Sequence, residues 1–219
     1  MKPKIFCLTA TLMTASASAQ FGPRVVMGDL NTIGAYDLAT LDAEPDGDLD
    51  VVATSNGAVV YLAQSRPGVY DNFRVLSSGH ADIRAIQTAD MDADGDRDVI
   101  FATRFGNGGE VLWLQNLGFG QFSMAMPVGP LAGALDIEIA DMDNDSDLDV
   151  VAVGFDSREV VWFEQTSVGT FAPPQTIESG NGTPFCLTVA DFDGNGALDV
   201  VVGTNAPSQL LLFRAQRFG

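Results

Sequence analysis

Short apolar runs separated by polar turns fill this chain, and four of the runs directly follow an acidic segment. Runs rich in valine, isoleucine and aromatic residues, bounded by Gly, Asn, Asp and Ser, are typical of β-strands and hairpins. No stretch keeps a period of 3.6 residues over the length of a helix, so we expect almost no helix. The pattern therefore predicts an all-β protein.

The acidic segments mark an internal repeat of about fifty residues. Their first aspartates, Asp42, Asp90, Asp141 and Asp191, are 48, 51 and 50 residues apart. Each copy has one apolar run before the acidic segment, one directly after it, and a third after a short polar link. Four short strands per repeat is the plan of a β-propeller blade, so we expect four blades of four antiparallel strands.

The two ends of the sequence suggest how such blades would be completed. Residues 210–215 form a third run, whereas residues 24–28 resemble a fourth. The N-terminal strand would then complete the last blade and close a four-bladed ring, which leaves no unpaired strand edge. The alternative is an open arc that completes a larger ring by dimerisation.

Each acidic segment places oxygen-bearing side chains at alternate positions of a nine-residue loop. In the second loop carboxylates occupy positions one, three, five, seven and nine. Gly95 at position six allows the left-handed backbone that wraps a chain around an ion. Calcium takes about six to eight oxygen ligands, and position seven adds its backbone carbonyl. The ninth carboxylate would bind the ion through both oxygens.

The four loops together give twenty predicted ligand positions. These are Asp42, Glu44, Asp46, Asp48, Asp50, Asp90, Asp92, Asp94, Asp96, Asp98, Asp141, Asp143, Asp145, Asp147, Asp149, Asp191, Asp193, Asn195, Ala197 and Asp199. The longer Glu44 and the rigid Pro45 make the first loop the weakest expected site. The third loop has Ser146 where glycine is expected, which should strain its turn.

The crowding of these carboxylates indicates a bound cation. Like charges about 4 Å apart repel by roughly 1 kcal/mol per pair in water and by more near a protein surface. Up to four Ca²⁺ ions are expected, because Mg²⁺ retains its water and soft metals prefer Cys or His ligands. An EF-hand needs flanking helices and a glutamate at position twelve, and no loop has one there.

The pattern D-x-D-x-D-G-x-x-D-V is followed by a strand, a hairpin, a Trp-Phe-Glu-Gln-like run and Gly-x-Phe. It resembles the FG-GAP/VCBS repeats of integrin-α-type propellers over essentially all of residues 20–219. The resemblance implies that the loop joins the first two strands of a blade and binds calcium. In the second copy the implied ligands are Asp90, Asp92, Asp94, Asp98 and the carbonyl of residue 96. Propellers of that family usually have seven blades, whereas this chain has four repeats.

The start of the chain predicts secretion. Lys2 and Lys4, an apolar stretch over 5–13 and small residues up to Ala19 form a signal-peptide pattern over 1–19, which leaves a propeller domain over 20–219. No later stretch is long and apolar enough to span a membrane. Cys186 is then the only cysteine, so no internal disulfide is expected, and its apolar surroundings predict a buried thiol.

Charge and chemistry narrow the expected function. A net charge of −18 argues against nucleic acid as a partner. The single His80, near Ser77, has no nucleophile elbow beside it, and Asp37 and Asp136 are the only acids outside the loops that suggest a possible site. We therefore expect a secreted, non-enzymatic binding or adhesion scaffold for a protein or glycan. The alternative is a polysaccharide-active lyase or hydrolase on the same scaffold.

Three aromatic residues, Tyr61, Trp113 and Trp162, recur at one strand position in successive copies. Such a stripe could stack against sugar rings. Large aromatic side chains more often fill the space between packed sheets, and we expect that role here.

Overall fold

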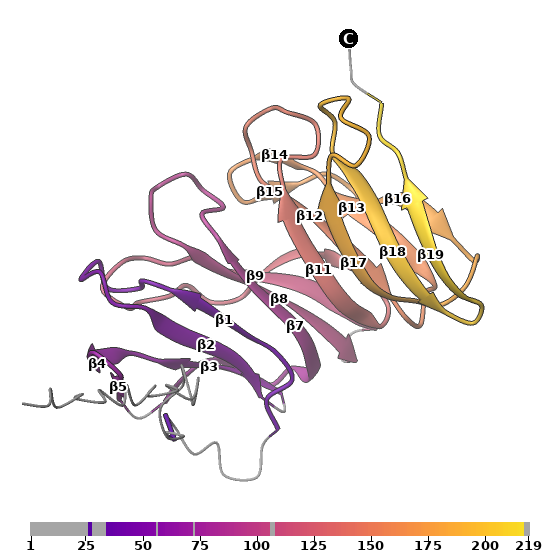
Figure 1. Cartoon of the computed structure of the whole chain (residues 1–219). Coiled ribbons are helices and arrows are strands. Elements are labelled where there is room, and N and C mark those ends of the chain that lie inside the picture. The colour runs from indigo at the N-terminus through magenta and orange to yellow at the C-terminus, as the bar shows by residue number, and fades with distance from the viewer. Residues whose placement is uncertain (1–25, 28–33, 56, 72, 106–107, 217–219) are drawn as a thin grey trace, which may run out of the picture.

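The repeat of the sequence becomes a row of small antiparallel sheets (Figure 1). The computed structural model describes residues 26–27, 34–55, 57–71, 73–105 and 108–216. Within these residues the regular structure consists of nineteen strands and no helix, as the sequence predicts. There is accordingly no helix among them that could cross a membrane.

Each repeat forms one sheet, in which neighbouring strands are antiparallel. Sheet 1 has the order β1 (Leu38–Leu41), β2 (Asp50–Ser55), β3 (Ala58–Leu62), β6 (Arg74–Ser78). Sheet 2 has the order β7 (Ala81–Ala89), β8 (Asp98–Phe105), β9 (Glu110–Leu114), β10 (Met126–Pro130). Sheet 3 has the order β11 (Ala134–Ala140), β12 (Asp149–Gly154), β13 (Glu159–Phe163), β16 (Gln175–Ser179). Sheet 4 has the order β17 (Pro184–Ala190), β18 (Asp199–Asn205), β19 (Ser208–Phe213).

Two small hairpins lie outside the four sheets. They are β4 (Gln64–Arg66) with β5 (Val69–Tyr70), and β14 (Gln165–Ser167) with β15 (Thr170–Phe171). Each hairpin follows the third strand of its repeat, where the sequence has a glycine and an aromatic residue. Gly68 and Gly169 have φ values of 73° and 69°, a conformation that glycine adopts without steric cost.

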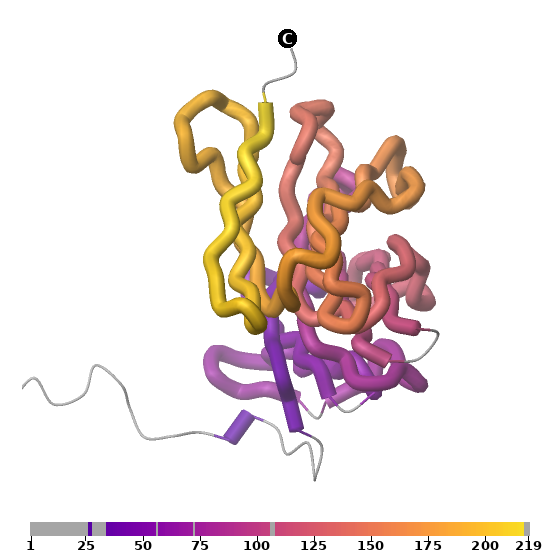
Figure 2. The backbone as a smooth tube through the Cα atoms, turned by 90° about the vertical axis from the view of Figure 1, so that its right-hand side faces the viewer, coloured from indigo at the N-terminus to yellow at the C-terminus, as the bar shows by residue number. Residues whose placement is uncertain are grey.

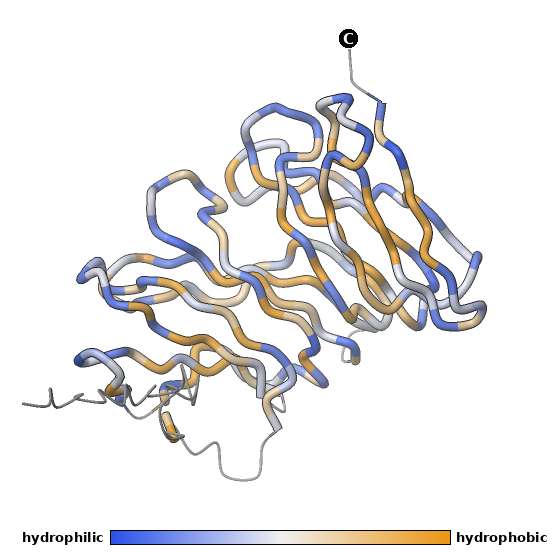
Figure 3. The backbone as a smooth tube through the Cα atoms, viewed as in Figure 1, coloured by the Kyte–Doolittle hydropathy of each residue, from blue (hydrophilic) through white to orange (hydrophobic). Residues whose placement is uncertain are grey.

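The central strands of sheets 2 and 3 are apolar on both faces, and each of these sheets lies between two others. Successive side chains of a strand point to opposite faces. Along β12, Val150 and Ala152 pack toward sheet 2, whereas Val151 and Val153 pack toward sheet 4. All four side chains are fully buried. The continuous apolar runs of the sequence therefore become two-faced strands, as in other sheets that are covered on both sides (Figure 3).

The recurring aromatic residues fill the space between sheets, as expected. Tyr61 belongs to the apolar cluster between sheets 1 and 2, and Trp113 to the cluster between sheets 2 and 3. Their exposed fractions are only 3% and 2%. Trp162 packs against the cluster between sheets 3 and 4. These rings are thus used for packing and are not free to stack on a sugar.

The first strands of the sheets contact one another in the order β1, β7, β11, β17 (Figures 1 and 2). This arrangement is propeller-like, but the described sheets form an open row and not a closed ring. The closed four-bladed ring expected from the sequence is therefore not confirmed. Most of the strand expected at 24–28 lies outside the described residues, and Val26 and Met27 belong to no strand.

The prediction of a buried thiol at Cys186 is wrong, because this residue is exposed. Cys186 pairs with Gly203 on the face of sheet 4 that is turned away from sheet 3. No further sheet covers that face within the described residues. An apolar sequence context predicts burial only where another layer lies on top of the strand.

The packing between sheets 2 and 3 predicts a strong coupling between Phe163 and Gly129. The Phe163 ring is fully buried and fills the space into which a Cβ on Gly129 would project. Phe163→Ala should lower the free energy of unfolding by about 3–5 kcal/mol, and Gly129→Ala by about 1–3 kcal/mol through overpacking. The double variant should lose clearly less than the sum, because the truncated ring leaves room for the new methyl group.

Urea denaturation of the two single variants and the double variant measures this coupling. Phe119→Ala is the matched control, since Phe119 is 81% exposed and its truncation should change stability by no more than about 0.5 kcal/mol. Additive losses in the double variant would show that the two residues do not meet as described.

Candidate metal sites in the acidic loops

The acidic loops occupy the same place in every sheet. Each loop joins the first strand of its sheet to the second, and the pairing registers are equivalent. The pairs that close the four loops are Leu41 with Asp50, Ala89 with Asp98, Ala140 with Asp149, and Ala190 with Asp199. Loops 1 to 4 therefore repeat one local structure, with its ninth residue at the start of the second strand.

The ninth aspartate of each loop is a buried brace. Asp98 accepts a hydrogen bond from the Met91 backbone N–H at 3.1 Å and another from the Asn116 N–H at 2.7 Å. It thereby fastens position two of the loop to the chain that leaves the third strand. The equivalent pairs are Ala43 and Gln64 on Asp50, Met142 and Gln165 on Asp149, and Phe192 and Ala215 on Asp199. Sequence reasoning missed this role, although a charged residue next to a run of valines was a signal for it.

Burial raises the pKa of two of these aspartates, Asp98 and Asp149. Desolvation raises the pKa of Asp98 to about 7, although the N–H groups of Asn116 and Met91 act in the opposite direction. Desolvation likewise raises the pKa of Asp149 to about 6, while the N–H groups of Gln165 and Met142 act in the opposite direction. Removing a carboxylate from water is unfavourable unless positive charge or further hydrogen bonds compensate. A cation bound in the loop would supply such compensation.

Three of the four loops bring carboxylates together. One oxygen from each of Asp90, Asp92 and Asp94 lies within 4.8 Å of the others, and Asp141, Asp143 and Asp145 form the same group in loop 3. In loop 4 the group consists of Asp191, Asp193 and Asp199. An all-oxygen group of this kind fits a hard cation such as calcium. Nine of the predicted ligands are therefore gathered into three groups.

A shared set of backbone hydrogen bonds explains the convergence. In loop 2 the Asp94 N–H donates to Asp90 Oδ1 at 3.1 Å, and the Gly95 N–H donates to Asp90 Oδ2 at 3.0 Å. Loops 3 and 4 repeat both bonds with the same relative positions. The first aspartate thus winds the chain into a tight turn, so that positions three and five face it.

The tight turn also needs a left-handed backbone at positions four and six. Position four has φ values of 58° at Ala93, 63° at Asn144 and 75° at Gly194. At position six Ser146 has a φ of 81°, so the strain expected there from the sequence is present.

Loop 1 differs from the other loops at position four, where it has Pro45. The proline ring fixes φ near −65°, so Pro45 is incompatible with the left-handed conformation that loops 2 to 4 have at position four. In loop 1 the Asp46 N–H donates to the backbone carbonyl of Glu44, and not to the side chain of Asp42. Among the described residues, the acids of loop 1 form no group like those of loops 2 to 4. Loop 1 therefore does not fit a calcium ion in the same way.

The remaining predicted ligands lie outside the three groups. At position seven the backbone N–H of Asp96 and of Asp147 donates to the side chain of position five. In loop 4 the Ala197 N–H donates to Asn195 Oδ1 at 2.7 Å, so the asparagine takes over the role of the aspartate in the turn. The residues outside the groups are Asp42, Glu44, Asp46, Asp48, Asp50, Asp96, Asp98, Asp147, Asp149, Asn195 and Ala197.

Asp37 and Asp136, the two acids outside the loops that suggested a possible site, link neighbouring sheets. Asp37 Oδ2 accepts the N–H of Ile86 in sheet 2 at 3.0 Å. Asp136 Oδ2 accepts the N–H of Leu187 in sheet 4 at 2.9 Å. Burial raises the pKa of Asp136, while the backbone N–H groups of Leu187 and Ile137 act in the opposite direction. Both carboxylates therefore have a structural explanation that needs no catalytic role.

His80 has a close polar neighbour as well. Its Nε2 atom lies 2.7 Å from Ser77 Oγ, and its ring packs edge-on against Phe101. Burial lowers the pKa of His80, whereas Glu110 acts in the opposite direction. Ser77 and His80 are three positions apart in the sequence, at the turn between β6 and β7.

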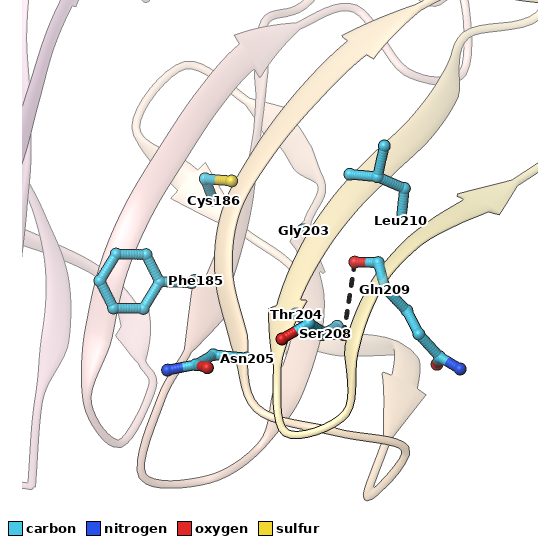
Figure 4. Close-up of a pocket in the computed structure, with 8 residues that line it drawn as sticks. All are labelled: Phe185, Cys186, Gly203, Thr204, Asn205, Ser208, Gln209 and Leu210. Atoms are coloured by element: carbon cyan, nitrogen blue, oxygen red, sulfur yellow. Dashed lines mark hydrogen bonds between the residues drawn. The ribbon is translucent and has the colours of Figure 1, made fainter.

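Two hollows lie at sheet 4. A polar crevice of about 640 Å³ separates β16 from β19, and its polar lining includes Arg158, Glu178, Asn181 and Gln209. A second depression of about 580 Å³ lies on the face of sheet 4 turned away from sheet 3 (Figure 4). Its lining includes Phe185 and Leu210, which are 55% and 81% exposed.

Comparisons with known proteins agree with this architecture. No curated protein matches the chain. Among solved structures, a lectin from Agrocybe aegerita that recognises non-reducing terminal N-acetylglucosamine has a TM-score of 0.53 at 20% identity. The match covers 80% of this chain and 51% of the lectin, so the chain spans about half the length of that neighbour. At this identity the likeness shows the fold alone.

Two further structures match with lower scores. The Tc holotoxin pore of Photorhabdus luminescens has a TM-score of 0.49 at 19% identity, covering 80% of this chain and 9% of that one. The V. cholerae biofilm matrix protein Bap1 has a TM-score of 0.41 at 15% identity, covering 80% of this chain and 36% of that one.

The acidic loops are matched directly at the level of sequence. The family model of the FG-GAP-like repeat matches residues 90–152 and 141–202, which together span loops 2, 3 and 4. Because these segments cover more than half of the chain, the protein belongs to the FG-GAP-like repeat family.

Proposed function

We propose that this protein is a non-enzymatic binding scaffold whose sheets are held by calcium ions in loops 2, 3 and 4. The observation that carries the proposal is the convergence of three carboxylates at the same place in three successive sheets. In each loop, positions one, three and five supply side-chain oxygens, position seven its carbonyl, and the buried ninth aspartate a further oxygen. Calcium accommodates such a set because its coordination number and geometry are flexible.

The chemistry of the loops predicts that calcium binding stabilises the fold. Calcium modules outside the cell bind with dissociation constants of about 10⁻⁴ to 10⁻³ M. A site filled at one hundred times its constant adds about 2.7 kcal/mol to the free energy of unfolding. For a chain of this size that corresponds to a rise in melting temperature of roughly 5–10 °C per filled site.

Calorimetric titration and thermal melts of the chelated protein test this prediction. Asp94→Ala and Asp145→Ala should each weaken calcium binding, whereas Glu44→Ala should change it little. Asp71→Asn is the matched charge control, since Asp71 is exposed and lies outside the loops. Identical melting curves in calcium and in EDTA would exclude the metal role, and a stronger loss from Glu44→Ala would reverse the ranking of the loops.

Calcium sites of this affinity fit an extracellular setting. We propose that residues 1–19 are removed on secretion and that residues 20–219 form the mature domain. The basic, apolar and small-residue order of the first nineteen residues supports this. The millimolar calcium outside cells would then keep weak sites filled, which cytosolic calcium would not.

A glycan is the ligand class that the surface supports best. The crevice beside β19 combines a guanidinium, a carboxylate and side-chain amides with the apolar Leu211, and sugars need both kinds of contact. Within it, Asn181 Nδ2 donates to Glu178 Oε1 at 2.8 Å, so the two groups already have a defined orientation. The Agrocybe aegerita lectin offers a precedent for glycan recognition on a similar fold.

Glycan-array screening in calcium buffer tests this ligand class. Asn181→Ala and Glu178→Gln should each lower affinity for the bound glycan about tenfold, since each removes hydrogen bonds at a charged or amide group. Gln121→Ala is the control, because Gln121 is exposed and lies outside the crevice. An array without binders, or unchanged binding by both crevice variants, would contradict the assignment.

The open row suggests how the scaffold is completed. On sheet 3, Val151, Val153, Val160 and Trp162 face sheet 4 and are covered by it. The pairing register places Val201, Gly203, Leu210 and Leu212 at the same positions of sheet 4, on its uncovered face. The same kind of interface thus joins sheets 1 and 2, sheets 2 and 3, and sheets 3 and 4. The equivalent face of sheet 4 has no sheet packed on it among the described residues.

We propose that a second copy of the chain continues this interface. On sheet 1 the positions by which later sheets contact the preceding one hold Ala53, Val60 and Leu62, which are already buried in the single chain. The second copy would therefore dock beside them, at the exposed part of the same face. Leu38, opposite Ala53 on that face, is 62% exposed. This favours the open arc that completes a larger ring over a ring closed within one chain.

The proposed association predicts a concentration-dependent dimer in analytical ultracentrifugation. Leu210→Arg should abolish the dimer, because it places an unpaired charge in the centre of the apolar face. Leu117→Arg is the matched control, since Leu117 is 57% exposed at a distant loop. A wild-type chain that sediments as a monomer throughout the micromolar range would refute the association.

A further inference from the structure

Loop 1 has an acidic residue at every ligand position but does not gather its acids. Its proline at position four forces a different backbone path. Its position-three residue, Glu44, is half-buried and extends toward the turn between β9 and β10 of sheet 2. The side chain fills the space beside Gly120, where a Cβ would overlap Glu44 Oε1. The carboxylate that should bind an ion therefore points to a neighbouring sheet.

An arginine lies beside the same space, although no ion pair within 4 Å joins it to Glu44 among the described residues. The Arg74 guanidinium lies over the Tyr61 ring, with Cζ 5.0 Å from the ring centroid, and donates to the Gly120 carbonyl oxygen. The position of a Cβ on Gly120 is 3.5 Å from Arg74 Nη2 as well as next to Glu44. Glu44, Arg74 and the Gly120 backbone thus share one small space between sheets 1 and 2.

The same place carries no cation in repeats 2 and 3. Arg74 pairs with Tyr61 across β6 and β3. The equivalent pairs are Met126 with Trp113 in sheet 2 and Gln175 with Trp162 in sheet 3. Arginines also lie at loops that gather their acids, since Arg97 belongs to loop 2 and Arg214 Nε lies 4.0 Å from Asp193 Oδ2 of loop 4. What distinguishes repeat 1 from repeats 2 and 3 is the guanidinium that lies over the aromatic ring of the third strand.

We infer that Arg74 takes the place of a calcium ion at loop 1, so that this loop is held by a side chain of the protein and stays metal-free. The inference rests on the proposed calcium role of loops 2 to 4 for its comparison, but not for the contacts of Arg74 themselves. Arg74 offers several N–H donors in a fixed plane, which suits it to bridge a carboxylate and a carbonyl. It also joins loop 1 to sheet 2, because Gly120 belongs to that sheet's repeat and its N–H donates to the Ala43 carbonyl at 2.9 Å.

Thermal melts in EDTA test the contribution of Arg74 without any metal. Arg74→Met should lower the melting temperature by about 2–4 °C, the shift expected for one interaction of moderate strength in a chain of this size. Arg66→Met is the matched control, since Arg66 is exposed in β4 and has the same charge. The loss from Arg74→Met should shrink in a Glu44→Gln background, because that background has no negative charge at position 44 for Arg74 to neutralise. Equal melts for Arg74→Met and Arg66→Met would overturn the inference.

Calcium stoichiometry supplies the second readout. The wild-type chain should bind three ions in calorimetry. A variant with Glu44→Asp, Pro45→Gly and Arg74→Met restores the short carboxylate and the left-handed position four, and should bind four. The same loop changes with Arg74 retained should give a fourth site at least tenfold weaker. Four ions bound by the wild type, with one lost in Asp46→Asn, would show that loop 1 is a metal site.

The two readouts separate this inference from the proposed function. If the chain bound no calcium in any loop, the function proposal would fail, and the melts in EDTA would still decide the role of Arg74. If loops 2 to 4 bound calcium and Arg74→Met behaved as its control, only the assignment of loop 1 would fail.

Discussion

A buried aspartate at the start of each second strand is the contact on which the rest of the arrangement depends. Its two oxygens hold position two of the acidic loop and the residue that follows the third strand. A carboxylate in this setting has lost its water, and removing one of its hydrogen-bond partners would leave a buried charge uncompensated. The loop is therefore fixed at its far end before any ion arrives. The brace alone does not gather the acids, since loop 1 has it as well. The carboxylates converge only in the loops whose first aspartate also accepts the N–H of position five.

The packing between sheets imposes the second constraint. A strand such as β12, apolar on both faces, is stable only between two layers, so each sheet depends on its neighbours. Polar contacts reinforce this dependence, since Asp37 and Asp136 each accept an N–H from the next sheet. Among the described residues the outer face of sheet 4 has no further sheet on it, and its Leu210 is exposed. The acidic loops and the apolar faces thus act at different levels: the loops join the strands within each sheet, and the faces join one sheet to the next.

Much of this could be predicted from the sequence, because the features repeat. The strands, the place of the loops and the role of Trp113 follow from apolar periodicity and a spacing that recurs four times. The brace made by Asp98 could not be assigned, because a ligand and a hydrogen-bonded carboxylate have the same sequence pattern. The exposure of Cys186 was missed because burial depends on the next layer, which local sequence does not encode. Pro45 was recognised as a disturbance, but its effect became clear only when the φ values of the other loops showed what position four requires.

The difference between loop 1 and the other loops has a consequence for how the row responds to its surroundings. An ion held by weak sites exchanges with solution, so the order of loops 2 to 4 would follow the calcium concentration. A guanidinium tethered to β6 has no such dependence, because its effective concentration at the loop is set by the chain. Local stability in proteins varies from one structural unit to the next. If loops 2 to 4 bind calcium as proposed, Arg74 between sheets 1 and 2 would keep that end of the row ordered when calcium is scarce and would give the later sheets an ordered neighbour to pack against. One repeat without a metal site would in this way preserve the register of the three proposed to have one.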